Sequence, residues 1–145
     1  MPEGLWWLPV LPAIAAAVID IRSRRLPNGI VMPALLASLA VAFWRGDIGL
    51  ALAGAALAAA VGLTIRYLAR GGFGLGDVKL LTYGGSVVGI GGVTALLLGT
   101  AAAGGALGLL YLSRQGRRAS VPYGVAITLG LAMALGVARW TAQTT

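Results

Sequence analysis

The stretch IGLALAGAALAAAVGLTIRYL, residues 48–68, decides the fold class of this chain. Arg66, close to its end, is the only charged side chain in it. A helix needs about 20 predominantly apolar residues to cross the hydrocarbon core of a bilayer, since each residue advances it by about 1.5 Å. The stretch has that length and that composition, so it predicts a transmembrane helix.

The composition of the whole chain extends this prediction beyond one helix. Of the 145 residues, 59% are hydrophobic and 10% are charged, and the mean hydropathy is +0.90. In a soluble domain about a quarter of the residues are charged, because the domain must cover a surface in contact with water. The charges here are too few for such a surface, so we predict a single membrane-embedded domain over residues 1–145.

Further apolar runs lie on either side of residues 48–68, separated by charged or turn-forming residues. The sequence therefore predicts an all-α fold, a polytopic membrane helix bundle with about six transmembrane helices. The predicted spans are residues 4–20, 29–44, 48–68, 77–90, 92–112 and 121–138. The first run starts without Lys or Arg, unlike a signal peptide, so we expect it to remain part of the protein.

Small residues recur within these runs at a spacing of four. In lipid, such residues let two helices approach each other closely. We therefore expect tight helix packing at three sets of positions. They are Gly54, Ala58 and Gly62; Gly85 and Gly89; and Gly104 and Gly108.

The basic residues indicate which side of the membrane each loop faces. Most of them fall in three clusters, in the loops after the first, third and fifth spans. The clusters are Arg22, Arg24 and Arg25; Arg66, Arg70 and Lys79; and Arg114, Arg117 and Arg118. Cytoplasmic loops carry an excess of basic residues, so we predict these loops in the cytoplasm and both termini on the non-cytoplasmic side. Topology and anionic membrane lipid explain the net charge of +7, and no nucleic-acid partner is predicted.

Two residue types that the chain lacks exclude several kinds of site. The sequence contains no cysteine and no histidine. Disulfides, catalysis by Cys or His, and metal sites built on thiolates or imidazoles are therefore excluded. We predict neither a metal nor a cofactor, and the sequence leaves the oligomeric state open.

The acidic residues are only four: Glu3, Asp20, Asp47 and Asp77. Glu3 and Asp47 fall in a terminus and a loop, where water reaches them. Asp20 ends the first span and Asp77 begins the fourth, so the predicted topology puts both on the cytoplasmic side at similar depth. Two carboxylates that meet in a poorly solvated site cannot both ionise easily and share a proton. One can then activate water while the other protonates a carbonyl, as in an aspartic protease.

Other roles for these two aspartates stay open at this point. Asp20 has Arg22, Arg24 and Arg25 nearby in sequence and Asp77 has Lys79, so each carboxylate can instead form an ion pair. Asp77 can also cap the first turn of its helix. Acids inside a membrane also mark ion paths, which keeps a small proton-coupled transporter as an alternative. A non-catalytic assembly subunit is a third possibility.

Two glycines, Gly74 and Gly76, come directly before Asp77. Glycine adopts backbone conformations closed to other residues and lets another chain pass close by. A protease needs such access, because the backbone of its substrate must lie against the catalytic carboxylates. We therefore expect these glycines to form the approach to Asp77.

Three segments, in this order along the chain, resemble motifs of the type IV prepilin peptidases, which are membrane aspartyl proteases of the GxGD type. Residues 20–28, DIRSRRLPN, resemble the family's segment around its first aspartate. Residues 74–81, GLGDVKLL, resemble its GxGD motif in the form GxGDxKLL. Residues 121–127, VPYGVAI, are similar to the Pro-Tyr-Gly-x-Ala-Ile stretch that opens the family's last helix.

The resemblance implies an endopeptidase that removes the short basic leader from type IV or Flp-type prepilins or pseudopilins, at the cytoplasmic face of the inner membrane. It implies that Asp20 and Asp77 are the catalytic pair, and that Gly74 and Gly76 are the flexible backbone before Asp77. Supporting or substrate-positioning roles are implied for four further positions, Lys79, Pro27, Asn28 and Tyr123.

The chain also departs from the longer, bifunctional members of that family. Those carry an additional cytoplasmic region with paired cysteines, and they methylate the new N-terminus of the pilin. This sequence has no cysteine and no loop long enough for such a region. The resemblance therefore implies a peptidase without N-methyltransferase activity, similar to the small enzymes of tight-adherence pilus systems.

Overall fold

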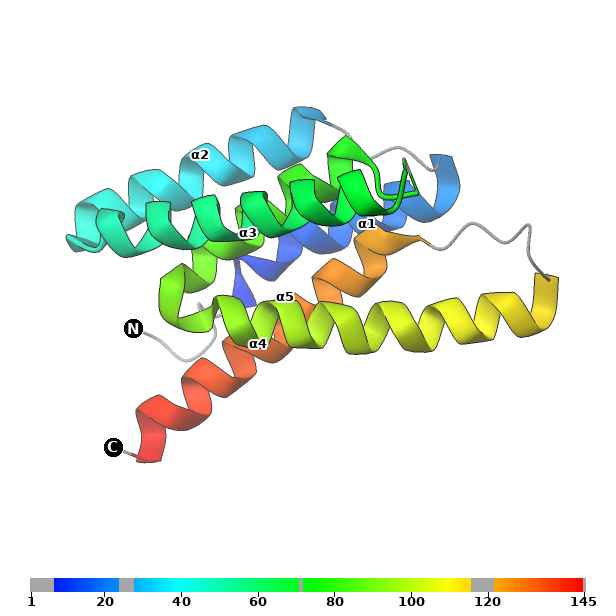
Figure 1. The fold of residues 1–145 in the computed structure, drawn as a ribbon. Helices are drawn as coiled ribbons and strands as arrows, with labels where there is room; N and C mark the ends of the chain where they lie inside the picture. The colour runs from blue at the N-terminus through cyan, green and yellow to red at the C-terminus, as the bar shows by residue number, and fades with distance from the viewer. Residues whose placement is uncertain (1–6, 24–27, 71, 116–121, 145) are drawn as a thin grey trace.

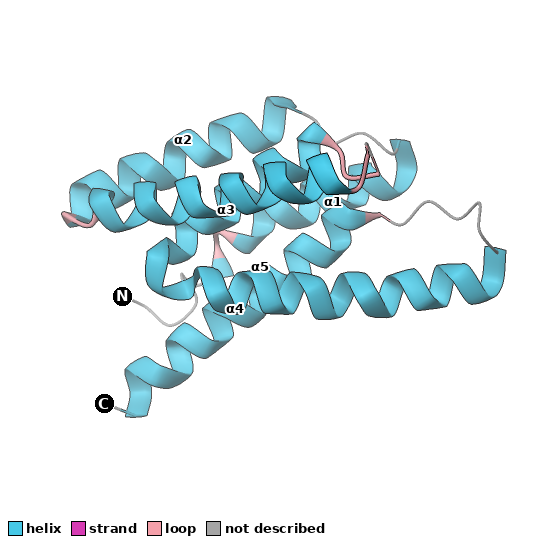
Figure 2. Ribbon diagram, viewed as in Figure 1, coloured by secondary structure: helices cyan, strands magenta, loops and turns pink. Residues whose placement is uncertain are grey.

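The computed structural model describes residues 7–23, 28–70, 72–115 and 122–144, and helices account for most of them (Figures 1 and 2). The helices in these ranges are α1 (Val10–Ser23), α2 (Asn28–Arg45), α3 (Ile48–Leu68), α4 (Leu75–Gln115) and α5 (Tyr123–Thr144). None of the described residues lies in a strand. The prediction of an all-α fold is confirmed.

The lengths of the helices agree with a protein that crosses the membrane several times. Four of the described helices, α2, α3, α4 and α5, are long and apolar enough to span a bilayer. Helix α1 has 14 residues, fewer than the roughly 17 that the shortest spans need. The prediction of several membrane-spanning helices is confirmed. The number of six spans and the side of the membrane on which each terminus lies stay predictions.

Helix ends differ from the predicted spans where polar residues continue a helix beyond its apolar run. Helix α3 has the predicted bounds, and α2 differs by one residue at each end. Helix α5 continues to Thr144 rather than ending at residue 138, and α1 continues past Asp20 to Ser23. Hydropathy measures the segment that fits into hydrocarbon, and a helix does not have to stop at the membrane surface.

Helix α4 consists of two helical arms, which correspond to the two spans predicted at residues 77–90 and 92–112. The sequence predicts a turn between them at residues 90–92, and the two arms together extend from Leu75 to Gln115. That helix is broken at Gly89, whose φ of 63° and ψ of −179° are not helical. Figure 1 shows that the green arm before this residue and the yellow-green arm after it run in opposite directions. The break thus falls one residue before the predicted turn, at a residue that tolerates positive φ.

The first arm of α4 packs against α3 through small residues, as predicted. A Cβ atom added to Gly85 would lie 2.6 Å from the Cβ of Ala58 and 2.9 Å from the carbonyl carbon of Gly54. A Cβ added to Gly54 would lie 2.6 Å from the carbonyl carbon of Gly89. The two backbones therefore touch. The predicted pair in the second arm, Gly104 and Gly108, does not make a close contact of this kind at Gly108. No neighbouring atom lies within 4 Å of a Cβ atom added there.

Two hydrogen bonds hold α1 against the helices that follow it. The Tyr83 hydroxyl of α4 donates to the Pro9 carbonyl at 2.6 Å, and the Thr128 hydroxyl of α5 donates to the Ala13 carbonyl at 3.0 Å. Hydrogen bonds between membrane helices contribute about 0.6 kcal/mol each on average. Helix α1, which carries Asp20, is therefore fixed to both α4 and α5.

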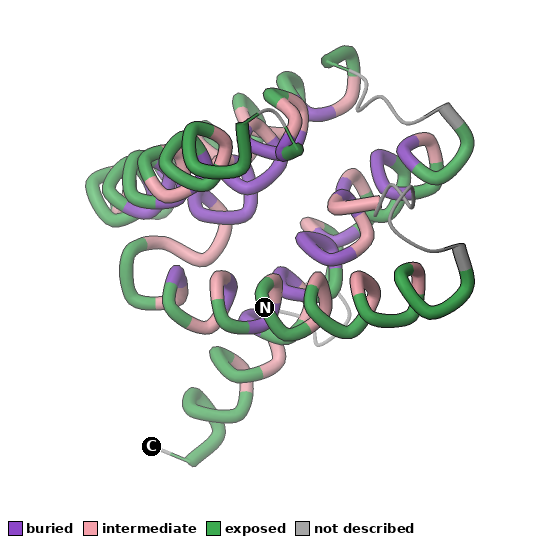
Figure 3. The backbone as a smooth tube through the Cα atoms, turned by 45° about the vertical axis from the view of Figure 1, so that its right-hand side comes forward, coloured by how far each residue is buried: buried purple, intermediate pink, exposed green. Residues whose placement is uncertain are grey.

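Burial separates the inside of the bundle from a broad apolar exterior (Figure 3). Leu80 and Leu81 of α4 and Ile127 and Leu131 of α5 are all no more than 1% exposed. Large apolar side chains cover the outer faces, and Leu109 in the second arm of α4 is 71% exposed. An outer surface of this kind fits hydrocarbon rather than water.

Candidate active site

Asp77 occupies the first turn of α4, where it closes the turn that contains the two predicted glycines. Gly74 lies just before the helix, and its N–H group donates to the Oδ2 atom of Asp77 at 2.9 Å. The Gly74 carbonyl in turn accepts the N–H of Val78 at 3.2 Å. This is half of a capping box, in which the third helical residue bonds back to the N–H of the capping residue. The predicted capping role of Asp77 is confirmed, and Asp77 is also buried, at 8% exposed.

Asp20 is held in a matching way by a different helix. Its side chain, also 8% exposed, projects from the last turns of α1 toward the start of α5. There the N–H group of Gly124 donates to the Oδ2 atom of Asp20 at 3.1 Å. The first N–H groups of a helix lack partners within the helix and carry partial positive charge, so they favour a carboxylate.

Contacts between the loop before α4 and the start of α5 bring the two aspartates together. The rings of Phe73 and Tyr123 meet edge to face, with their centroids 5.4 Å apart. Arg66 of α3 fixes this loop, since its Nη1 atom donates to the Phe73 carbonyl at 2.8 Å. Gly74 directly follows Phe73 and Gly124 directly follows Tyr123. Asp77 and Asp20 therefore bond to two backbone segments that lie against each other.

Basic side chains do not neutralise the pair within the described residues. Lys79, the predicted ion-pair partner of Asp77, instead donates from Nζ to the Oδ1 atom of Asn28 at 3.0 Å, an exposed contact between α4 and the start of α2. No ion pair of Asp20 or Arg22 is found among the described residues. Arg24 and Arg25, the other ion-pair partners considered for Asp20, lie outside the described residues, so that alternative is tested only for Arg22 and Lys79.

The glycines of the site have ordinary backbone angles, and their role as the approach to Asp77 stays a prediction. Positive φ angles occur, among the described residues, only at Gly46, Arg70 and Gly89. Gly74 and Gly76 therefore do not use a conformation closed to other residues. What Gly74 provides is room, since a Cβ atom there would lie 3.1 Å from the Oδ2 atom of Asp77.

Gly124 is a residue of the site that the sequence alone did not single out. A Cβ atom at this position would lie 2.9 Å from the Oδ2 atom of Asp20 and 3.3 Å from its Cβ atom. The signal was present in the Pro-Tyr-Gly segment, of which only Tyr123 received a predicted role. Tyr123 packs against Phe73, and Asn28 bonds with Lys79, so both have structural contacts next to the aspartates. Pro27 lies outside the described residues.

The composition of the site limits its chemistry. No group of three or more His, Cys, Asp or Glu side chains that could hold a metal ion occurs in the described ranges. The chemically active groups brought together are two carboxylates, each oriented by one backbone N–H. Such a pair is suited to the exchange of protons with water and a carbonyl group.

Fold and site together define a class: a helical membrane protein with two buried carboxylates at one end of its bundle. The chain belongs to the type IV leader peptidase family, whose sequence model matches residues 7–109. The match includes both aspartates and ends before α5, so Tyr123 and Gly124 lie outside it. No curated protein matches the chain, and neither does any solved structure.

Proposed function

We propose that this protein is an aspartic-type endopeptidase that removes the short basic leader of type IV or Flp-type prepilins or pseudopilins. Membership of the leader peptidase family supports the class of reaction. The observation that carries the proposal for the site is a pair of buried aspartates, Asp20 and Asp77, from helices far apart in the sequence. Each accepts an N–H group from one of two segments that contact each other through the rings of Phe73 and Tyr123.

The two carboxylates divide the work of hydrolysis. The ionised carboxylate takes a proton from water, whose oxygen bonds to the carbonyl carbon of the scissile peptide, and the neutral one donates its proton to the carbonyl oxygen. When the tetrahedral intermediate collapses, the peptide C–N bond breaks and the leaving nitrogen takes a proton from a carboxyl group. Each bond from a glycine N–H uses an Oδ2 atom, which orients the carboxylate and leaves its Oδ1 atom for water and substrate.

We place this reaction at the cytoplasmic face of the inner membrane. Three basic residues, Arg22, Arg66 and Arg114, lie in the last turns of α1, α3 and α4. Those helix ends are on the same side of the bundle as the start of α4 and of α5, the right side of Figure 1. The excess of basic residues in cytoplasmic loops supports this orientation. The proposal covers leader removal without N-methylation, because the paired cysteines that the bifunctional relatives carry are absent from the sequence.

Co-expression with candidate prepilins from the same genome, followed by mass measurement of the product, tests the proposal. The unchanged chain is expected to shorten its substrate by the mass of the leader. Asp20→Asn and Asp77→Asn should each lower the cleavage rate by about 100-fold to 10,000-fold, the usual contribution of general acid–base catalysis. Glu3→Gln is the matched control, a loss of one carboxylate outside both motifs, and should cleave normally.

Two other results would contradict the proposal. Cleavage at the normal rate in either Asn variant, with equal amounts of protein in the membrane, would remove that aspartate from the mechanism. Absence of cleavage by the unchanged chain, together with aspartate-dependent proton flux in liposomes, would favour the transporter instead.

A further inference from the structure

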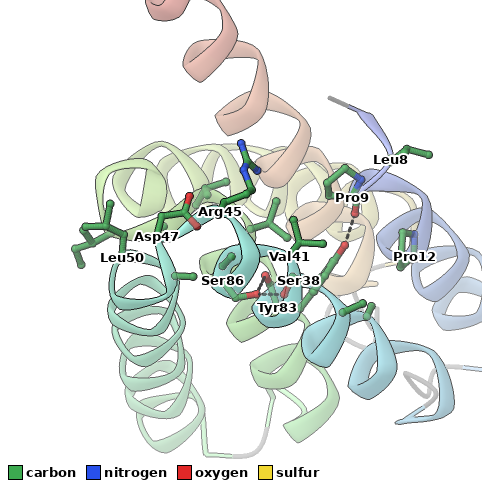
Figure 4. Close-up of a pocket in the computed structure, with 18 of the residues that line it drawn as sticks. Leu8, Pro9, Pro12, Ser38, Val41, Arg45, Asp47, Leu50, Tyr83 and Ser86 are labelled. Carbon is green, nitrogen blue, oxygen red and sulfur yellow. Dashed lines mark hydrogen bonds between the residues drawn. The ribbon is translucent and has the colours of Figure 1, made fainter. Parts of the chain in front are cut away.

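A cavity of about 460 Å³ lies between α1, α2, α3 and the first arm of α4 (Figure 4). The connection between α2 and α3 beside it lies at the opposite end of the bundle from the starts of α4 and α5 (Figure 1). Residues from Tyr83 to Gly91 form one wall, and the loop between α2 and α3 lies at the rim. Along α4 the nearest wall residue, Tyr83, is about 9 Å from Asp77 at the rise of a helix, and Gly89 is about 18 Å away. Neither aspartate lines the cavity, which is therefore distinct from the candidate active site, and its volume is in the range of small-molecule sites.

The inner polar groups of this cavity already have partners in the protein. The hydroxyl groups of Ser38 and Ser86 share a hydrogen bond of 2.6 Å, and that of Tyr83 donates to the Pro9 carbonyl at 2.6 Å. Figure 4 shows both bonds as dashed lines inside the cavity. Alanine, valine and leucine side chains supply much of the remaining lining. An occupant of this inner part needs no hydrogen-bonding groups and is best matched by hydrocarbon.

The rim of the cavity has the opposite character. Asp47 and Arg45 both line it, and Figure 4 shows them on the same side. The Oδ1 atom of Asp47 is buried without a hydrogen-bond partner, and Asp47 does not cap α3 with its side chain. Arg45 is exposed, at the last residue of α2. The rim thus carries a half-buried carboxylate, one oxygen of which is buried without a donor, beside an exposed cation.

The rim also lies at the level where a membrane meets water. Trp7 precedes α1, Trp44 lies next to Arg45 in the last turn of α2, and Trp140 lies near the end of α5; they are 42%, 86% and 70% exposed. Tryptophan is enriched at the level of lipid headgroups. Lining residues Val41 and Leu50 are 46% and 58% exposed, so the cavity opens toward the surrounding lipid.

We propose that this cavity binds one phospholipid with an amine headgroup, such as phosphatidylethanolamine. One acyl chain fills the apolar interior. At the rim, the guanidinium of Arg45 contacts the phosphate, and the ammonium group donates a hydrogen bond to the Asp47 carboxylate. Charge complementarity at the rim and the paired polar groups inside favour this amphipathic occupant over a helix of a protein partner. The inference goes beyond the proposed peptidase activity and does not depend on it.

Native mass spectrometry of the full chain in detergent tests this site. The chain is offered equal amounts of phosphatidylethanolamine, phosphatidylcholine and phosphatidylglycerol with the same acyl chains. Phosphatidylcholine keeps the positive charge but has no N–H group to donate, so it isolates the bond to Asp47. We expect a phosphatidylethanolamine adduct to be retained about tenfold better, the change that one charge-assisted hydrogen bond produces.

Three variants separate the parts of the site. Asp47→Asn should abolish the preference for phosphatidylethanolamine over phosphatidylcholine, and Arg45→Gln should weaken retention of both. Ala37→Phe fills the cavity from an exposed position of α2 and should remove the adduct. Ala40→Phe, exposed on the same helix but outside the lining, and Arg114→Gln are matched controls and should bind normally.

Other outcomes would overturn the proposal. Equal retention of the three lipids would indicate a non-selective surface, as would an adduct that survives Ala37→Phe. Preference for phosphatidylglycerol would mean that only negative charge is recognised. A co-purified peptide in place of lipid would identify a protein occupant. If Ala37→Phe fails to fold, the loss or survival of headgroup preference in Asp47→Asn still decides the question.

Discussion

Asp77 combines two functions that usually compete for one carboxylate. Its Oδ2 atom caps the first turn of α4 by accepting the N–H of Gly74, whereas its Oδ1 atom is left for the proposed chemistry. Asparagine at this position keeps an acceptor for the cap and loses the acid. Asp77→Asn is therefore a cleaner test of catalysis than alanine, which would also remove the cap at a cost of about 1 kcal/mol.

Gly124→Ala should displace Asp20 without removing its carboxylate. The added methyl group would lie 2.9 Å from the Oδ2 atom and 3.3 Å from the Cβ atom of Asp20, so the side chain must move. A displacement of about 1 Å of a catalytic group can cost about 100-fold in rate. We expect a loss of prepilin cleavage of that order, measured at equal protein levels in the membrane. Gly136→Ala, on the same helix with no atom within 4 Å, should cleave normally, and equal rates in both variants would contradict the expectation.

The bond between Lys79 and Asn28 should have a small effect, because it is exposed. Lys79→Met and Asn28→Ala are each expected to change the cleavage rate by less than about threefold and the free energy of unfolding by less than about 1 kcal/mol. If the two residues act only through each other, the double variant should be no worse than either single variant. A loss in Lys79→Met as large as that in Asp77→Asn would instead assign Lys79 a direct role.

At the scale of elements, the α3–α4 contact depends on the absence of side chains. Gly85→Ala would place a methyl group 2.6 Å from the Cβ of Ala58 and against the backbone of Gly54. Overpacking of this kind typically costs about 1–3 kcal/mol. We expect a lower unfolding temperature in detergent, with Gly91→Ala on the same helix as the control, since nothing lies within 4 Å of that position. Identical unfolding temperatures would argue against the backbone contact.

The turn at Gly89 requires glycine because of its backbone angles, and not because a side chain would clash with neighbouring atoms. Its φ of 63° and ψ of −179° fall in a region that is almost restricted to glycine, and forcing another residue there costs about 1–3 kcal/mol. A Cβ atom would be 3.5 Å from the nearest atom, the Leu50 carbonyl oxygen, which is ordinary contact. Gly89→Ala should therefore destabilise the protein although it creates no clash. A variant as stable as the unchanged chain would show that the turn does not need this conformation.

The ends of a helix were predictable from the sequence where charged or turn-forming residues directly flank its apolar run. Helix α3 has its predicted bounds because a long, predominantly apolar run lies between Asp47 and the Ala-Arg-Gly-Gly segment after Leu68. The end of α5 was missed because helix formation continues through Arg139 and Trp140, beyond the apolar run. Gly89 could not be identified as the point of reversal, since several glycines near it have similar neighbours in sequence.

For the whole molecule, the orientation in the membrane can be measured directly. Because the natural sequence has no cysteine, a single introduced cysteine reports its own position without further changes. Ala69→Cys, after α3, and Gln143→Cys, in the last turn of α5, are both exposed. We expect a membrane-impermeant maleimide to label Gln143→Cys in cells with a permeable outer envelope and Ala69→Cys only after the inner membrane is opened. The reverse pattern would invert the proposed topology, and the unchanged chain should not be labelled.

The candidate site was predictable only in part, for a reason that concerns the whole molecule. Asp20 and Asp77 stood out because acids are scarce and both fall at the edges of apolar runs. Gly124, the hydrogen-bond partner of Asp20, could not be recognised from the sequence. It lies 104 residues further along the chain, and only the packing of α1 on α5 brings the two residues together. Hydropathy and motif spacing describe residues that are near one another in sequence. They carry no information about a contact between residues so far apart in the chain.

The bond between Asp20 and Gly124 also has a consequence for biogenesis. A ribosome synthesises α1 before α5, so Asp20 has no Gly124 partner until α5 has been made. A nascent chain without α5 therefore carries both acids but lacks the N–H group that orients one of them. The proposed proteolytic activity is expected to begin only after α5 has packed against α1.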